Sequence, residues 1–250
     1  MRQRKQATFV LVHGAWHGGW CWKKLTPLLR AAGHEVITPT LTGLAERAHL
    51  LSPEIGLDTH IADVAGLLEY EDLHNVVLVG HSYGGMVIAG VAEKAAELLA
   101  HLVFLDAFVP QDGQSLFDTI PDHGAAMRKI AEESGDGWRV PLGKATFGVT
   151  DEIDVAWMIP RITPQPLRSF EEPVRLTNQA ALALPRSYIL CRQDEPSLFD
   201  PFAKQAQYTG WGYYELMTGH DAMITMPEAL ATILLEVVAA CTRCSGAFTF

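Results

Sequence analysis

The 250-residue chain has little of several features that define whole classes of protein. It has only four cysteines, too few for a small domain held together by a disulfide framework. No run of 18 or more apolar residues is present, so we expect no segment that spans a bilayer. Its 19 Lys and Arg residues stand against 29 Asp and Glu, which gives a net charge of −10. Such a surface repels phosphate, so we expect neither nucleic acid nor an anionic membrane as partner.

The first residues are basic but are not followed by the apolar stretch of a signal peptide. The apolar segment at Thr8–Val12 is too short for that purpose. We therefore expect a cytoplasmic protein with reduced thiols. A hydrophobic content of 48% in 250 residues is enough for a substantial core, in one large domain or two small ones.

Short apolar segments alternate with helical patterns along most of the chain. The segments predict strands at Thr8–Val12, His34–Pro39, Asn75–Val79, Leu102–Leu105, Ser187–Cys191 and Tyr213–Met217. The patterns between them predict helices at Gly19–Ala32, Asp58–Glu69, Tyr83–Glu97 and Pro227–Ala240. This alternation indicates an α/β protein with about six mostly parallel strands and helices on both faces of the sheet. Ligands of such folds bind at the edge where the strands end.

The stretch from Gln111 to Leu184 departs from this alternation. It holds many of the prolines and scattered large apolar residues, and no clear strand. Because it is too long for a plain loop, we predict a helical cap at 111–184, inserted into a core formed by 1–110 and 185–250. Its aromatic residues, among them Trp138 and Trp157, either fill a small core of the cap or line a pocket, and the sequence leaves both alternatives open.

A G-x-S-x-G pattern centred on Ser82 follows one predicted strand and precedes one predicted helix. The five letters alone are a weak signal, but a strand, sharp turn and helix are what a nucleophile elbow requires. The alternative is that Ser82 is an ordinary helix N-cap. As a nucleophile, Ser82 would need a base and a carboxylate that orients the base.

His220 is the candidate base, because it follows the last predicted strand at the ligand-binding edge. Three carboxylates are candidates for the acid. Asp194 and Asp106 each follow a strand, and Glu195 lies next to Asp194. We favour Asp194 because its strand precedes the one that carries His220, and we leave Asp106 as the alternative.

The stabilisation of a developing oxyanion requires two backbone N–H groups. One is expected from Tyr83, the residue after the nucleophile, and the other from Ala15 in the glycine-rich loop after the first strand. An alternative interpretation makes His13 and His17 of that loop a metal pair. No third ligand follows at a suitable spacing, so we predict no metal site.

These motifs resemble those of the α/β-hydrolase superfamily. The segment TFVLVHGAWHGGW at 8–20, the segment VGHSYGGM at 79–86, and YILC at 188–191 leading to Asp194 are similar to the group of plant methylesterases, plant hydroxynitrile lyases and related bacterial esterases. The resemblance covers most of the chain but not 111–184. It implies that Ser82, Asp194 and His220 form the triad and that Ala15 and Tyr83 are the oxyanion donors.

Three positions depart from the group. The lyases carry a lysine after the catalytic histidine, where this chain has Asp221, and a threonine where it has Gly14. We expect the Asp221 charge to oppose an anionic leaving group, so both changes count against a lyase. The esterases usually carry leucine at the position of Tyr83, which leaves the shape of the acyl pocket open.

Together these features predict a serine carboxylesterase that needs no cofactor. Its expected substrates are small to medium apolar or aromatic esters, bound by Trp16, Phe108, Trp138 and Trp157. The alternatives are a hydroxynitrile lyase or C–C hydrolase on the same scaffold, and a non-catalytic ligand receptor. The sequence is compatible with a homodimer but does not fix the oligomeric state.

Overall fold

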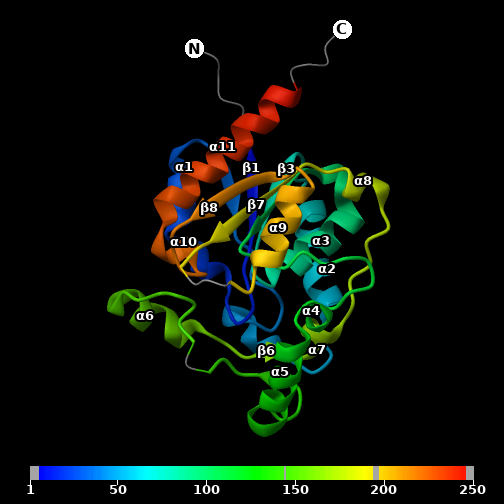
Figure 1. Cartoon of the computed structure of the whole chain (residues 1–250), viewed down its shortest axis with the longest axis vertical. Helices are drawn as coiled ribbons and strands as arrows, with labels where there is room; N and C mark the ends of the chain where they lie inside the picture. Colours follow the sequence, from blue (N-terminus) through cyan, green and yellow to red (C-terminus); the bar gives the residue numbers. More distant parts are fainter. Residues whose placement is uncertain (1–5, 144, 194–196, 246–250) are drawn as a thin grey trace.

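A central parallel sheet organises the molecule (Figure 1). The computed structural model describes residues 6–143, 145–193 and 197–245. In this part of the chain the sheet has six strands in the order β2-β1-β3-β4-β7-β8. The strands are β1 (Thr8–Val12), β2 (Glu35–Ile37), β3 (Val76–His81), β4 (Leu99–Leu105), β7 (Arg186–Cys191) and β8 (Gly212–Leu216). All six predicted strands are present, and the predicted α/β class is confirmed.

Both faces of the sheet are buried, as continuous apolar strands predict. In β1, Val10 and Val12 pack on one side, whereas Phe9 and Leu11 pack on the other. This alternation follows from the two-residue period of a strand. The sheet therefore separates two hydrophobic layers and is a rigid base for the loops at its edge.

Helices cover both layers (Figure 1). The described helices of this part are α1 (Leu25–Ala31), α2 (Leu57–Tyr70), α3 (Gly84–Ala95), α9 (Asp200–Tyr208), α10 (Ala222–Thr225) and α11 (Pro227–Ser245). The helix predicted at Gly19–Ala32 is divided into a 3-10 helix at Gly19–Lys23 and α1. Pro27 lies in the first turn of α1, where its missing N–H is not needed. Helix α9 was not predicted.

The segment between β4 and β7 contains helices, as expected. They are α4 (Leu116–Thr119), α5 (Pro121–Ser134), α6 (Glu152–Met158), α7 (Arg168–Glu171) and α8 (Gln179–Leu182). The expectation that it holds no strand was wrong, because β5 (Arg139–Val140) and β6 (Gln165–Pro166) form a short antiparallel pair. Two residues per strand are too few for a sequence pattern to reveal. In Figure 1, α4, α5 and α7 lie together below the central sheet, and α6 lies apart from them to the left.

The register of the central strands determines which loops meet. Val12 of β1 pairs with Gly80 of β3, and His81 of β3 pairs with Leu105 of β4. Ser82 and Asp106 therefore follow paired residues of adjacent strands. Since parallel strands end at the same edge, these two positions are neighbours in space.

Among the described helices, none combines the length and the apolar character that crossing a bilayer would require.

Candidate active site

Ser82 lies in a sharp turn between β3 and α3. Its backbone has a φ of +55°, a left-handed conformation that is unfavourable for serine. The turn is held by the Ser82 amide, which donates to the Leu105 carbonyl at 3.2 Å, and by the Ser82 carbonyl, which accepts from Phe108 at 3.2 Å. A Cβ at Gly80 would lie 2.5 Å from the Gly84 carbonyl oxygen. The G-x-S-x-G pattern therefore has a steric basis here.

His220 follows β8 and has a carboxylate partner. Its Nδ1 donates to Asp106 Oδ2 at 2.6 Å. The imidazole also stacks on Phe199, with ring centres 4.9 Å apart and an angle of 7°. Because Nδ1 carries the proton, Nε2 is left as the acceptor. The histidine thus has the tautomer that a general base requires.

Asp106 is almost completely buried, with 3% of its surface exposed. Its Oδ1 accepts from the Cys191 amide at 3.0 Å, so both carboxylate oxygens are engaged. Asp194, which we favoured as the acid, lies outside the described residues, as does Glu195. Among the described residues, the carboxylate on His220 is the alternative, Asp106. The useful signal was the position of Asp106 directly after the strand next to β3.

The loop after β1 passes next to Ser82. A Cβ on Gly14 would lie 2.9 Å from the Cβ of Ser82, so only glycine fits there. Neither the Ala15 amide nor the Tyr83 amide donates a hydrogen bond to another described group. His13 Nδ1 donates to the Gly14 carbonyl at 2.8 Å, which fixes the peptide that carries the Ala15 N–H. Two unengaged amides beside a serine match the needs of an oxyanion site.

Trp16 connects this loop to the segment between β4 and β7. Its backbone is left-handed, with a φ of +65°. The Trp16 amide donates to Gln165 Oε1 at 3.1 Å, and the indole Nε1 donates to the Val140 carbonyl at 2.8 Å. The Trp16 carbonyl accepts from the Thr163 amide at 3.1 Å. Three hydrogen bonds therefore hold the loop against the inserted segment.

The side chain of Tyr83 is buried and anchored. His60 Nε2 donates to the Thr42 carbonyl at 3.0 Å, so its Nδ1 accepts from the Tyr83 hydroxyl at 2.8 Å. Burial lowers the pKa of His60 to about 4 and keeps the imidazole neutral. The Tyr83 ring also packs edge-on against Phe170, with centres 5.6 Å apart. The Tyr83 side chain is therefore held in place between His60 of α2 and Phe170 of α7.

The predicted substrate-binding residues divide into two pairs. Trp16 packs on Phe147 and Phe170, and Phe108 packs on Phe199, the ring that stacks on His220. In the described structure, the ring contacts of Trp157 are with Trp20 and Arg161, and that of Trp138 is with Arg139. These contacts do not connect Trp138 or Trp157 to Ser82 or His220.

Two further aromatic residues, Phe147 and Phe199, lie against His220 and were not predicted from the sequence. Phe199 precedes α9, the helix that was not predicted, and Phe147 lies in an irregular segment with no periodic pattern. Neither position had a local sequence signal that would have placed it near the base.

The expected role of Asp221 was wrong. Its side chain is fully buried, and its Oδ2 lies 3.0 Å from His17 Nε2. The partner offsets the negative charge that we expected to act on a leaving group. His13 and His17 have hydrogen-bond partners on both ring nitrogens, so neither has a nitrogen free for a metal.

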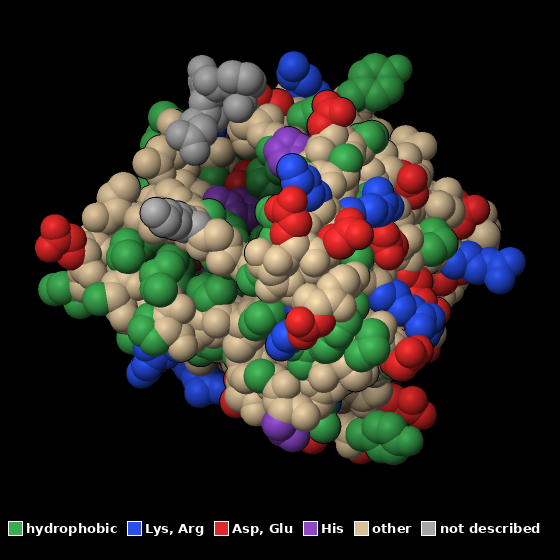
Figure 2. Space-filling model, turned by 90° about the horizontal axis from the view of Figure 1, so that it is seen from below, with side chains coloured by type: hydrophobic (Ala, Val, Ile, Leu, Met, Phe, Trp, Pro, Cys, Tyr) green, Lys and Arg blue, Asp and Glu red, His purple; other side chains and the backbone are tan. Residues whose placement is uncertain are grey.

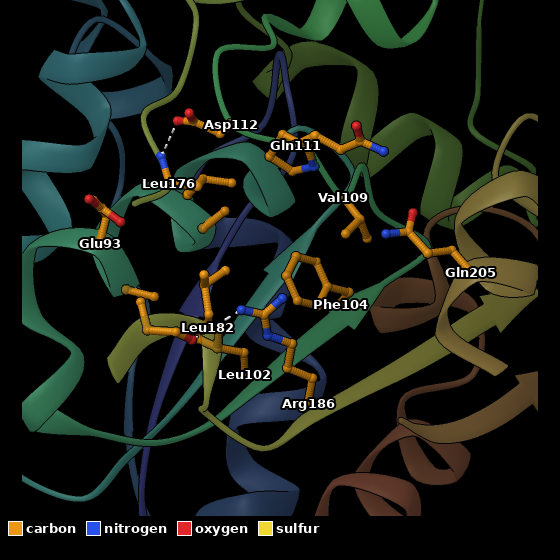
Figure 3. Close-up of a pocket in the computed structure, with 14 residues that line it drawn as sticks. Glu93, Leu102, Phe104, Val109, Gln111, Asp112, Leu176, Leu182, Arg186 and Gln205 are labelled. Atoms are coloured by element: carbon orange, nitrogen blue, oxygen red, sulfur yellow. Dashed lines mark hydrogen bonds between the residues drawn. The ribbon is translucent and has the colours of Figure 1, made fainter. Parts of the chain in front are cut away.

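Two hollows lie near the sheet. One of about 250 Å³ is bordered by Asp106, Phe199 and His220. Figure 2 shows a hollow in the surface seen from below, with a histidine side chain inside it. The other, of about 210 Å³, is shown in Figure 3, where Leu102 and Phe104 of β4 and Arg186 of β7 project into it. Its described lining contains no Ser, Cys or His.

A model described as the alpha/beta hydrolase family matches residues 9–233. A carbendazim hydrolyzing esterase from Nocardioides sp. (strain SG-4G) is 44% identical, over 90% of this chain and 97% of the relative. The pFDCC methylesterase MES16 of Arabidopsis thaliana is 29% identical, over 92% of this chain and 94% of the relative.

Solved structures agree with these matches. The crystal structure of MES16 covers 93% of this chain and 99% of its own, with a TM-score of 0.66 and 28% identity. An extracellular alpha/beta-hydrolase from a Paenibacillus species has a TM-score of 0.80 at 24% identity, and the match covers 92% of this chain and 98% of that one. The second likeness shows a shared fold.

The neutral state of His60 makes stability depend on pH. A folded pKa of about 4, below the ordinary value of 6.5, means that the unfolded chain gains a proton first as the pH falls. The buried neutral imidazole of His60 adds to the free energy of unfolding above pH 6.5, and this contribution is lost as the pH falls toward 4. Between pH 7 and pH 5 the loss in free energy of unfolding amounts to about 2 kcal/mol.

We therefore expect His60→Gln to lose about 2 kcal/mol less free energy of unfolding than the wild type between these pH values. Urea unfolding at pH 7 and pH 5 measures this difference. Tyr83→Phe is the control, because it removes the hydroxyl but leaves the imidazole buried. An unchanged pH dependence in His60→Gln would contradict the assignment.

Proposed function

This chain belongs to the alpha/beta hydrolase family and is a carboxylic ester hydrolase, and on that premise we propose that Ser82, His220 and Asp106 carry out its reaction. The observation that carries the proposal is the 2.6 Å contact from His220 to Asp106, at the sheet edge where Ser82 occupies its strained turn. A serine hydroxyl is a weak nucleophile, and an oriented imidazole makes it reactive.

In the proposed mechanism, Ser82 Oγ attacks the ester carbonyl while His220 Nε2 takes the hydroxyl proton. Asp106 holds the Nδ1–H tautomer and stabilises the imidazolium. The amides of Ala15 and Tyr83 donate to the developing oxyanion. His220 then returns the proton to the departing alcohol, and water repeats the sequence on the acyl-enzyme to release the acid. The reaction uses only groups of the chain, the substrate and water.

The surroundings of the site favour an apolar acyl or alcohol group. Aromatic rings of Trp16, Phe108 and Tyr83 lie in the elements next to Ser82. Phe147 and Phe199 contact His220. We propose small to medium apolar or aromatic esters as substrates, with residues 111–184 acting as a cap over the site.

Replacement of the nucleophile tests the proposal most directly. We expect Ser82→Ala to lower kcat on a p-nitrophenyl ester by up to about a million-fold, because no other group can form the acyl-enzyme. Labelling with a fluorophosphonate should disappear in the same variant. Hydrolysis at an appreciable fraction of the wild-type rate by Ser82→Ala would remove this residue from the nucleophile role.

A pair of matched substitutions distinguishes the two acids. We expect Asp106→Asn to lower kcat by about 10³- to 10⁴-fold, since the amide does not stabilise the imidazolium and allows the wrong tautomer. Asp194→Asn should change kcat by less than about tenfold, because Asp106 already occupies Nδ1. Steady-state kinetics at pH 8 measure both. The reverse ranking would assign the role to Asp194.

The substrate class is tested by a series of p-nitrophenyl esters with acyl groups of rising length, together with benzoate and succinate esters. We expect kcat/KM to favour the apolar and aromatic acyl groups over the charged one by about 10-fold or more, because burial of a charge without a partner is unfavourable. A preference for the succinate ester would contradict an apolar pocket.

A further inference from the structure

A buried ion pair lies beneath the site and is not used by the proposed mechanism. His17 comes from the loop after β1, and Asp221 directly follows His220. Their side chains are 1% and 0% exposed, and His17 Nε2 lies 3.0 Å from Asp221 Oδ2. Two residues 204 positions apart are therefore joined in the interior, between the loop with Ala15 and the loop with the base.

Both nitrogens of His17 donate hydrogen bonds. Nδ1 lies 2.7 Å from the Ala15 carbonyl oxygen, which can only accept, and Nε2 faces the Asp221 carboxylate. Burial disfavours the charged imidazole, but the Asp221 carboxylate and the Ala15 carbonyl outweigh it and raise the pKa of His17. The His17 imidazole is thus held between two acceptors, and its contact with the Asp221 carboxylate is buried in the interior.

Backbone hydrogen bonds fix Asp221 on its other side. Its amide donates to the Phe147 carbonyl at 3.1 Å. Its carbonyl accepts from Ile224 at 2.8 Å and Thr225 at 3.1 Å, at the start of α10. These bonds hold the backbone of Asp221, directly after His220, from which the carboxylate reaches His17.

The nucleophile turn joins the same cluster. His81, which precedes Ser82, donates from Nε2 to the His220 carbonyl at 3.1 Å. The same Nε2 lies 3.8 Å from Asp221 Oδ1. Burial lowers the pKa of His81 well below its ordinary value, so it remains neutral. Three loops that supply the oxyanion amide, the nucleophile and the base thus meet at His17, His81 and Asp221.

We propose that His17 and Asp221 are positioning residues, which lock the Ala15 amide and the His220 imidazole at a fixed separation across Ser82. The inference rests on the proposed function. Burial of two charges costs more free energy than an apolar pair of the same volume, so stability alone does not account for them. A role in holding the two loops together accounts for the pair, because a shift of about 1 Å in a reacting group lowers the rate by up to about 100-fold.

The test uses Asp221→Ala, which cuts the link, and Asp221→Asn, whose amide can donate to a neutral His17. We expect Asp221→Ala to lower kcat by about 10- to 100-fold with KM within about threefold, and Asp221→Asn to recover most of the loss. His17→Asn keeps a donor for the Ala15 carbonyl but does not reach Asp221, so it should resemble Asp221→Ala. The double variant His17→Asn/Asp221→Ala should have a kcat no lower than that of either single variant, because both changes cut the same link.

A transition-state analogue separates positioning from stability. Ser82 Oγ adds to the carbonyl of an aryl trifluoromethyl ketone, its proton passes to His220, and the carbonyl oxygen becomes an anion. We expect the inhibition constant of this ketone to rise in each variant in proportion to the loss of kcat/KM. His101→Gln is the matched control, because His101 is also buried and bonded to Ser187 Oγ at 2.9 Å at the other end of β7. It should lower Tm with kcat within about twofold.

Wild-type kcat and inhibitor affinity in Asp221→Ala would overturn the proposal. So would losses that add in the double variant, or failure of both Asp221→Ala and His17→Asn to fold, since the pair would then serve the fold itself. These outcomes are distinct from failure of the proposed function, which appears as activity in Ser82→Ala.

Discussion

The close approach of β3 and α3 around Ser82 is the constraint on which the site depends. A left-handed serine persists only where its surroundings hold it, and here they do so through backbone contacts that exclude side chains. A Cβ on Gly84 would lie 2.8 Å from the Val12 carbonyl oxygen, and one on Gly85 would lie 2.1 Å from that of Phe108. Strand β1, strand β3 and the residues after β4 therefore pack against one turn, and the other site groups are placed relative to it.

The fold was largely readable from the sequence because its strands are apolar on both faces and its main helices have clear periodicity. The strands at Thr8–Val12 and Ser187–Cys191 matched patterns that local physics strongly favours. The missed elements are those that tertiary contacts create. The pair β5 and β6 has two residues per strand, and α9 has only nine residues.

The site was only partly readable for a related reason. The positions of Ser82 and His220 follow from strand ends, which sequence patterns reveal. The choice between Asp106 and Asp194 depends on the register of neighbouring strands and on the path of a loop, which they do not reveal. Leu105 pairs with His81, and this pairing brings Asp106 level with Ser82. The partnership of His17 and Asp221 spans most of the chain and has no local signature.

The attachment of Trp16 has a consequence for how a ligand enters. Val140, Thr163 and Gln165 come from one inserted segment, and all three bind the same residue next to Ala15. A rigid-body movement of that segment would therefore also displace the backbone of Trp16 and its neighbour Ala15. If the proposed site is correct, an ester that enters by rotation of side chains leaves the backbone at Ala15 in place, whereas an ester that enters by movement of the whole segment displaces it.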